Sequence, residues 1–212
     1  MGITERKQKA RLAMRTLILD TAMRLFLEEG FEKVTVRRIA GAIEYSPATI
    51  YLYFRDKNDI LFALHAEGFD RFYRLQQTVL QVKDPWERLR MHARVYISFA
   101  LENREYYDLM FIMRGPVEKL KAARDWSVGI RSYDFLKENI RDCMAAGYLP
   151  KTEVDVAAFA IWSFTHGMAS LIIRQRCAMI SPDLLSSVVD GAIDFMTARI
   201  EKGKMIGKGR RK

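Results

Sequence analysis

Apolar residues recur at helical spacing along almost the whole chain, and this periodicity constrains the fold more than any other feature of the sequence. Between residues 10 and 29, for example, Met14, Ile18 and Ala22 stand four residues apart and therefore share one helical face. No segment sustains the alternation of apolar and polar residues that marks a half-buried strand. The sequence therefore predicts an all-α protein.

Capping residues divide this helical pattern into elements. Gly30 follows the first amphipathic stretch at a position that ends a helix. Thr35 then precedes one short apolar run, and Ser46, with Pro47 at the first helical position, precedes another. Two very short helices are predicted here. Further helices are predicted to begin at capping residues, namely Asp56, Asp84, Thr152 and Ser181.

Residues 35–54 have the organisation of a helix-turn-helix motif, in which a second short helix enters the DNA major groove. Ile39 and Ile50 supply inward apolar positions, and the small Ala40 lets the two helices approach closely. The second helix begins with Ser46, Pro47, Ala48 and Thr49, whose low profile fits a groove about 12 Å wide. The pattern predicts an N-terminal three-helix DNA-binding domain.

A three-helix packing unit without any ligand is the plainer alternative for the same residues. It leaves Tyr51, Tyr53 and Lys57 exposed without a role. Tyrosine hydroxyls donate to phosphate, and a lysine at a helix start adds to the positive end of the helix dipole. These three residues therefore favour the DNA-binding interpretation.

Residues 22–61 resemble the DNA-binding domain of the tetracycline-repressor (TetR) family of transcriptional regulators. The resemblance extends over about residues 10–65 and rests on several spaced elements that agree at once: Ala22, Phe26, Gly30-Phe31, Thr35, Ile39-Ala40, Ser46, Thr49-Ile50-Tyr51, Tyr53-Phe54 and Lys57. It implies an all-α homodimer that binds a pseudo-palindromic operator on double-stranded DNA and responds to a small-molecule effector. It also implies a DNA-binding domain at 1–56, a helical ligand-binding and dimerisation domain at 57–203, and a basic tail at 204–212 that we expect to be disordered.

The resemblance implies a DNA contact for nine residues, namely Thr35, Arg37, Ser46, Pro47, Ala48, Thr49, Tyr51, Tyr53 and Lys57. Arg37 matches a position that reads a guanine edge, with an exposed cation or a phosphate contact as the alternative. Tyr53 and Lys57 match backbone contacts. One departure is Glu44, which stands where the family usually has glycine. A side chain there costs about 1 kcal/mol if the backbone is left-handed.

The net charge of +9 is segregated along the chain. Residues 1–15 carry +4 and residues 202–212 carry +6, which leaves −1 for the rest. A basic N-terminal arm suits contact with a polyanion. The arm has no continuous apolar stretch, so we expect no secretory signal. Two cysteines are too few for a disulfide framework, and a cytoplasmic location is expected.

Residues 156–173 run without a formal charge, at the lower length limit for a membrane-spanning helix. Polar residues interrupt the stretch, so a buried or protein–protein interface helix is favoured, and no membrane partner is expected. The last helix also has surplus apolar surface. The predicted dimer interface consists of Trp162, His166, Ala169, Ile173, Leu185, Val189, Ile193 and Met196. The pattern from Trp162 to Gly167 also resembles a subgroup of the family.

Aromatic and methionine residues are concentrated in the middle of the chain, where helical bundles bind apolar ligands. Ordinary bundle core is the alternative for each of them. If a pocket exists, the predicted lining is Tyr107, Phe111, Trp126 and Phe164. The effector is expected to be small and apolar or amphipathic.

Motifs of the common enzyme classes are missing from the sequence, and His65, His92 and His166 have no metal-ligand spacing. We therefore predict no enzyme, metal site or cofactor. The leading hypothesis is a ligand-responsive DNA-binding regulator that represses transcription. A helical interaction protein or membrane-associated adaptor without sequence-specific DNA binding is the alternative, and an all-α enzyme acting on an apolar substrate is a third.

Overall fold

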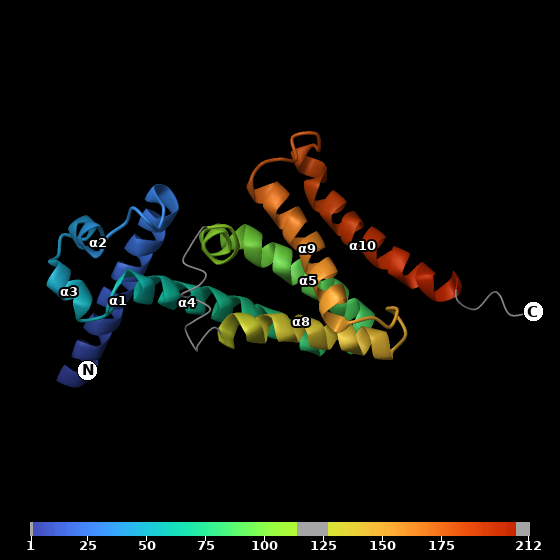
Figure 1. The fold of residues 1–212 in the computed structure, drawn as a ribbon, viewed down its shortest axis with the longest axis horizontal. Helices are drawn as coiled ribbons and strands as arrows, with labels where there is room; N and C mark the ends of the chain where they lie inside the picture. The colour runs from blue at the N-terminus through green and yellow to red at the C-terminus, as the bar shows by residue number, and fades with distance from the viewer. Residues whose placement is uncertain (1, 114–126, 207–212) are drawn as a thin grey trace, which may run out of the picture. The chain divides into compact units, whose positions relative to one another are not determined.

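The computed structural model describes residues 2–113 and 127–206, with side chains described up to residue 196 except at residue 3 (Figure 1). The elements are α1 (Ile3–Glu29), α2 (Val36–Ala42), α3 (Pro47–Tyr51), α4 (Lys57–Gln77), the 3₁₀ turn η1 (Thr78–Gln81), α5 (Pro85–Glu102), α6 (Arg104–Tyr107), the π-helical η2 (Asp108–Ile112), α8 (Ser127–Ala145), α9 (Val154–Ile173) and α10 (Pro182–Ile206). No described residue is in a strand, which confirms the all-α prediction.

The chain forms two compact units. Among the described residues, the first comprises residues 2–70, 105–113 and 127–128, and the second comprises residues 71–104 and 129–206. Helix α4 contributes to both units, so the boundary between the units lies within a helix and each unit is made of separate segments of the chain. The predicted domains, a DNA-binding domain that ends at residue 56 and a ligand-binding domain that begins at residue 57, are defined by function rather than by compactness. Their boundary stays a prediction.

Local capping bonds set the lengths of the helices in the first unit. Thr35 Oγ1 accepts a hydrogen bond from the Arg38 amide at 3.1 Å, and Ser46 Oγ accepts from the Thr49 amide at 3.3 Å. Pro47 occupies the first turn of α3, as predicted. Gly30 ends α1 with a φ of 84°, a conformation that costs glycine little. The capping residues therefore predicted the helix starts of this unit correctly.

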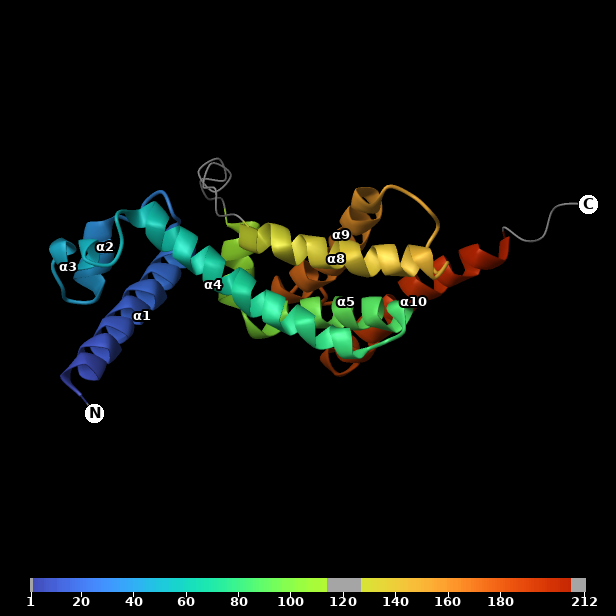
Figure 2. The ribbon, with the colours of Figure 1, turned by 90° about the horizontal axis from the view of Figure 1, so that it is seen from below.

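A continuous apolar core joins α1, α2, α3 and α4 of the first unit. It contains Ile18, Ala22, Leu25, Phe26, Ile39, Ala40, Ile50, Phe54, Ile60, Leu61, Leu64 and Leu109. Both ribbon views show α2 and α3 side by side next to α1 (Figures 1 and 2). Since Ile39 and Ile50 are fully buried, the opposite sides of α2 and α3 face outward.

The second unit has a core of its own, in which α5 packs against α9. One apolar cluster joins Trp86 and Leu89 of α5 to Ile140 and Cys143 of α8 and to Ala158 of α9. Burial raises the pKa of the Cys143 thiol to about 12. This unit also buries a polar group: Gln76 Nε2 lies 2.9 Å from His92 Nε2, and Ser132 Oγ donates to Gln76 Oε1 at 2.7 Å.

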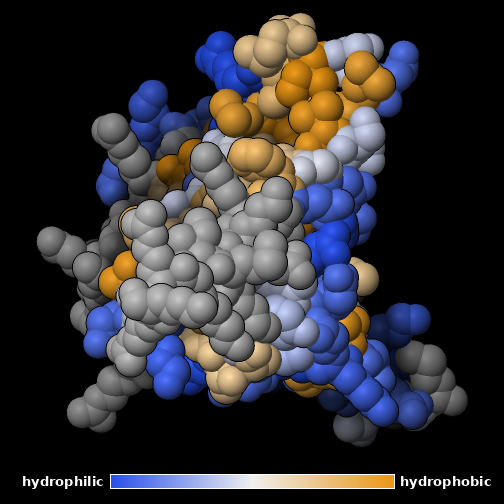
Figure 3. All heavy atoms as spheres, turned by 90° about the vertical axis from the view of Figure 1, so that its right-hand side faces the viewer, coloured by the Kyte–Doolittle hydropathy of each residue, from blue (hydrophilic) through white to orange (hydrophobic). Residues whose placement is uncertain are grey.

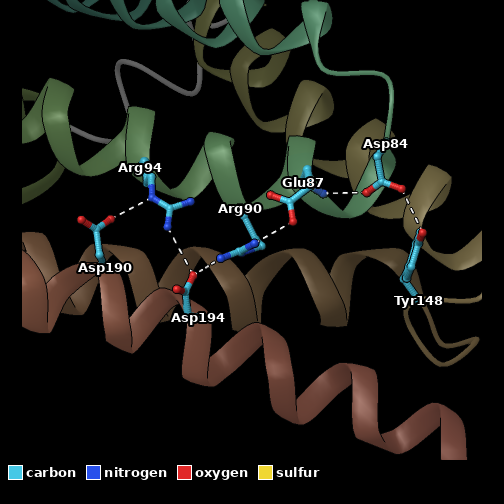
Figure 4. Close-up of polar contacts among 7 residues, drawn as sticks. All are labelled: Asp84, Glu87, Arg90, Arg94, Tyr148, Asp190 and Asp194. Atoms are coloured by element: carbon cyan, nitrogen blue, oxygen red, sulfur yellow. Dashed lines mark hydrogen bonds and ion pairs between the residues drawn. The ribbon is translucent and has the colours of Figure 1, made fainter.

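Ion pairs hold α10 against α5 within the second unit (Figure 4). Arg94 Nε donates to Asp190 Oδ1 at 2.8 Å and Arg94 Nη2 donates to Asp194 Oδ1 at 3.3 Å. Arg90 also pairs with Asp194, which holds the pKa of that carboxyl below its usual range. Both arginines lie on α5 and both aspartates lie on α10, so the network fixes the position of α10 along α5.

Helices α9 and α10 leave many apolar side chains exposed in the single chain. By length and composition α9 is the one described helix apolar enough to cross a membrane, and 17% of its most apolar window is buried within the protein. The large exposed apolar residues on the two helices are Val156, Phe159, Leu171, Leu184, Val188 and Phe195. Figure 3 shows apolar side chains gathered at the upper end of one face, where Figure 1 places the turn between α9 and α10.

Two residues of the predicted dimer interface are placed differently by the structure. Ala169 is 0% exposed and Ile193 is 1% exposed, because both pack inside their own chain. Helical spacing identified an apolar helix without showing which face turned inward, and the interface role of these two residues stays a prediction. Trp162, His166, Ile173, Leu185, Val189 and Met196 are all half-buried.

Candidate nucleic-acid interface

Helix α3 presents small and polar residues outward while its one large aliphatic residue is buried. Ile50 is 0% exposed, whereas the Tyr51 side chain next to it is 57% exposed. Ser46 and Ala48 are exposed, and Pro47 and Thr49 are half-buried. The outward surface therefore begins with short side chains, which allow close approach of a flat or grooved partner.

The hydroxyl groups at the start of α3 form a local pair. Ser46 Oγ lies 3.2 Å from Thr49 Oγ1, in addition to accepting from the Thr49 amide. The pairing restricts the rotamers of both side chains before any partner arrives, and a hydroxyl both donates and accepts. This start of α3 is therefore an ordered hydrogen-bonding surface.

Two adjacent arginines on α2 have different environments. Arg38 donates to Glu29 Oε1 from Nε at 3.0 Å and from Nη2 at 2.8 Å, which attaches α2 to the end of α1. Arg37 is exposed and forms no ion pair with any described residue. Its guanidinium keeps the fork of donors that binds a guanine edge or a phosphate.

The turn between α2 and α3 has the hydrogen bonds of a Schellman motif. The Tyr45 amide donates to Ala40 O at 3.0 Å and the Glu44 amide donates to Gly41 O at 3.3 Å. Glu44 has a φ of 59°, in the left-handed region where glycine is favoured. The backbone at Glu44 is therefore left-handed, which is the condition under which a side chain at this position was expected to be unfavourable. The turn forms with a strained residue.

Lys57 has partners that the sequence did not predict. Its ammonium donates to the carbonyl oxygens of Phe31 at 2.8 Å, Val34 at 3.2 Å and Glu32 at 3.3 Å. It also lies 4.3 Å from the centroid of the Phe31 ring, which is a cation–π contact. In this structure Lys57 holds the connection between α1 and α2, and its contact with phosphate stays a prediction.

The remaining predicted DNA contacts lie near the same surface. Thr35 is exposed although its hydroxyl caps α2, and Tyr53 is half-buried and packs against the core. Arg55, which was not among the predicted contacts, has a side chain that is 89% exposed directly before α4. Its position two residues before Lys57, outside any apolar period, is the signal that could have identified it.

The predicted ligand-lining residues are only partly brought together. Tyr107 is fully buried, and its ring centroid lies 5.6 Å from that of Phe111 within the first unit. Phe164 is half-buried in the second unit, and Trp126 lies outside the described residues. A pocket of about 320 Å³ in the first unit is lined by other residues, namely Asp20, Thr21, Met23, Arg24, Leu64, Glu105 and Tyr106.

Together, the short α2, the Schellman turn and the outward start of α3 make a helix-turn-helix with its second helix free to enter a groove. An all-helical chain that presents such a motif belongs to the class of DNA-binding regulators. Residues 18–64 match the model of bacterial regulatory proteins of the tetR family, and residues 89–196 match the tetracyclin repressor-like C-terminal domain. The chain belongs to the TetR family.

Individual relatives agree with this assignment. The chain is 26% identical over 156 residues to the transcriptional regulator HbdR of Aromatoleum sp. (strain CIB), covering 72% of this chain and 67% of HbdR. It is 48% identical over 59 residues to the transcriptional repressor Rv1474c of Mycobacterium tuberculosis, which is 28% of this chain and 32% of that protein. The structure of Bacillus subtilis FadR in complex with stearoyl-CoA has a TM-score of 0.70 at 18% identity, over 86% of this chain and 97% of that one.

Family membership confirms the predicted class of function. The protein is a ligand-responsive, DNA-binding transcriptional regulator of the repressor type. The relatives are regulators rather than enzymes.

Proposed function

We propose that this chain binds a pseudo-palindromic operator as a homodimer, with α3 of each protomer in the major groove, and that a small apolar or amphipathic effector releases it. The observation that carries the proposal is the start of α3, where exposed small residues surround the Ser46–Thr49 hydroxyl pair. The regulator acts in the cytoplasm, where its operator and effector are both available.

The proposed base contacts come from Arg37 on α2 and from Ser46, Pro47, Ala48 and Thr49 on α3. Pro47 and Ala48 offer only apolar contact, which suits thymine methyl groups. Tyr51 contacts a thymine methyl group or a phosphate, and Thr35 and Tyr53 contact the DNA backbone. Specificity therefore depends on few hydrogen bonds, and DNA shape contributes the remainder.

The proposed dimer interface is the exposed apolar face of α9 and α10. A Cβ atom added at Gly167 or Gly191 would meet nothing within 4 Å in the single chain, so both positions are flat and open. Flat positions among exposed aliphatic and aromatic side chains let helices of two copies approach closely. Phe159 and Val188 are 62% and 43% exposed in the single chain. Burying them against a second copy would remove apolar surface from water and so stabilise the dimer.

Selection of bound sequences from a random DNA pool tests the proposal. The wild-type protein should enrich an inverted repeat whose half-sites are one helical turn apart or a multiple of it. Arg37→Ala and Thr49→Ala should each change the preferred bases as well as the affinity. Arg38→Ala removes the same charge from the same helix and should keep the preferred sequence, because Arg38 is paired with Glu29.

Enrichment of no sequence, or of one without symmetry, would contradict the proposal. The effector part is tested by adding acyl-CoA thioesters of increasing chain length to the protein–operator complex and measuring release. Fractionation of cells tests the alternative of a membrane-associated adaptor, which requires α9 to hold the protein in the membrane fraction.

A further inference from the structure

The first turns of α1 form a helix that contributes almost nothing to the core. α1 begins at Ile3, yet its fully buried residues start only at Ile18. Residues 4–13 are all exposed. Glu5 supports the start of this segment, since its carboxylate accepts a hydrogen bond from the Gly2 amide at 2.9 Å. The segment is therefore an ordered rod that extends beyond the first unit's core, and its exposed side chains need another explanation.

Cations follow one face of this rod. Lys7, Arg11 and Arg15 stand four residues apart, so they lie one above another along the helix. We call these three residues the basic stripe. None of them forms an ion pair with a described residue. Like charges at this spacing destabilise a helix by about 0.2–0.5 kcal/mol per pair, and cations near a helix N-terminus oppose its dipole. The stripe is thus electrostatically unfavourable until an anion lies beside it.

One end of the basic stripe, Arg15, lies beside the end of the proposed recognition helix. The Arg15 guanidinium carbon lies 5.3 Å from the centroid of the Phe54 ring. The Phe54 amide in turn donates to Ile50 O of α3 at 3.0 Å, so Phe54 is fixed to the end of that helix. Both ribbon views show the N-terminal turns of α1 continuing past α3 (Figures 1 and 2). Lys7 lies about 12 Å further along the helix than Arg15.

We propose that the basic stripe binds phosphates of the DNA backbone just outside the half-site that α3 occupies. The inference rests on the proposed function, because it takes the position of the DNA from α3. If α1 runs along the DNA axis, the 12 Å extension reaches at most roughly four flanking base pairs on each side, at a rise of about 3.4 Å per base pair. The contacts add affinity without sequence preference, since phosphates carry no base information.

The test is the salt dependence of operator binding by the full chain. Removing one phosphate contact lowers the slope of log K against log salt by about 0.9, so Lys7→Gln/Arg11→Gln should lower it by about 3.6 for a dimer. Arg6→Gln/Lys9→Gln is the matched control, because it removes the same charge from the same exposed turns on a different face. This control should change the slope by less than half as much.

A second measurement uses duplexes with zero to six base pairs beyond the operator on each side. Wild-type affinity should rise over the first four flanking pairs or so, and the Lys7→Gln/Arg11→Gln variant should show no such rise. Circular dichroism checks that both double variants keep their helix content.

An unchanged slope in the variant, or equal changes in variant and control, would overturn the inference. Affinity that does not depend on flank length would also overturn it. These outcomes differ from failure of the proposed function, in which the wild-type protein selects no operator at all.

Discussion

The pair α2–α3 and the pair α9–α10 distribute their apolar residues in opposite ways. In α2 and α3 the aliphatic residues Ile39 and Ile50 are fully buried, and small or polar residues face outward. In α9 and α10 residues as large as Phe159 and Leu184 are about 60% exposed. An outward surface that hydrogen-bonds suits a hydrated, charged partner, whereas an outward surface of aliphatic and aromatic groups suits another protein surface. This contrast supports the proposals that α2–α3 contacts DNA and that α9–α10 contacts a second copy.

Placing a charge on the apolar pair should have the largest effect. Phe159→Glu would bury an unpaired carboxylate between two copies, at a cost of about 3 kcal/mol or more, and should raise the dimer dissociation constant over a hundredfold. Sedimentation velocity over a range of concentrations measures it. Leu80→Glu is the control, because Leu80 is 53% exposed on η1. A Phe159→Glu variant that stays dimeric would contradict the proposal that α9 and α10 form the dimer interface.

Acid should destabilise the protein through one buried histidine in each unit. Burial lowers the pKa of His65 and of His92 to about 4, below the ordinary 6.5. The unfolded state binds the proton first, so stability is full above pH 6.5 and is lost as the pH falls toward 4. Each histidine should cost about 2 kcal/mol by pH 5 and about 3 kcal/mol by pH 4.

Denaturant unfolding of His65→Gln and His92→Gln at pH 7 and pH 5 measures these contributions. Each variant should lose less stability between the two pH values than the wild type does. Unfolding in two separate transitions, with only one of them shifted by His65→Gln, would show that the two units unfold separately. Equal acid sensitivity in the wild type and both variants would refute the assignment of the effect to these side chains.

Lys57→Met should lower stability by about 2 kcal/mol, because three carbonyl groups between α1 and α2 lose a charged donor. Thermal unfolding measures the change, and Lys33→Met in the same connection is the control, since Lys33 is exposed. If Lys57 also contacts phosphate, the salt slope of DNA binding should fall by about one per protomer. Unchanged stability would show that the three contacts contribute nothing.

Glu44→Gly should have the smallest effect and the opposite sign. Glycine relieves the left-handed backbone at φ 59° but has more freedom to lose on folding, so the net gain should be roughly 0.5–1 kcal/mol. A small rise in melting temperature is the expected result. Destabilisation would mean that the Glu44 side chain makes a contribution larger than its strain.

Local signals in the sequence were sufficient for much of the fold. Thr35, Ser46 and Asp84 were predicted as caps, and each accepts a hydrogen bond from the amide three residues later. Asp56 likewise accepts from the amides of Asn58 and Asp59. α9 begins at Val154, with Glu153 rather than Thr152 as its cap residue. Caps are predictable because both partners lie within one turn of the chain.

Other features depend on contacts between distant parts of the chain. The carbonyl partners of Lys57 lie 23 to 26 residues before it, and no local pattern marks them. Met110 of the π-helical η2 and Tyr106 of α6 both pack against Gly68, where an added Cβ would lie 2.6 Å from Met110 Sδ. The burial of Ala169 and Ile193 was not predicted, because α9 and α10 are apolar on more than one side and periodicity alone cannot choose between two such sides.

The ion pairs between α5 and α10 add a second route by which ionic strength reaches this regulator. Asp190 and Asp194 are about half exposed, so salt screens their attraction to Arg90 and Arg94. The helix they secure carries part of the surface proposed to join two copies. Salt would then lower the affinity for the operator in two ways. It would screen the contacts with the phosphates directly, and it would weaken dimerisation indirectly. Salt titrations of DNA binding should therefore be run at protein concentrations well above the dimer dissociation constant, where only the first route contributes.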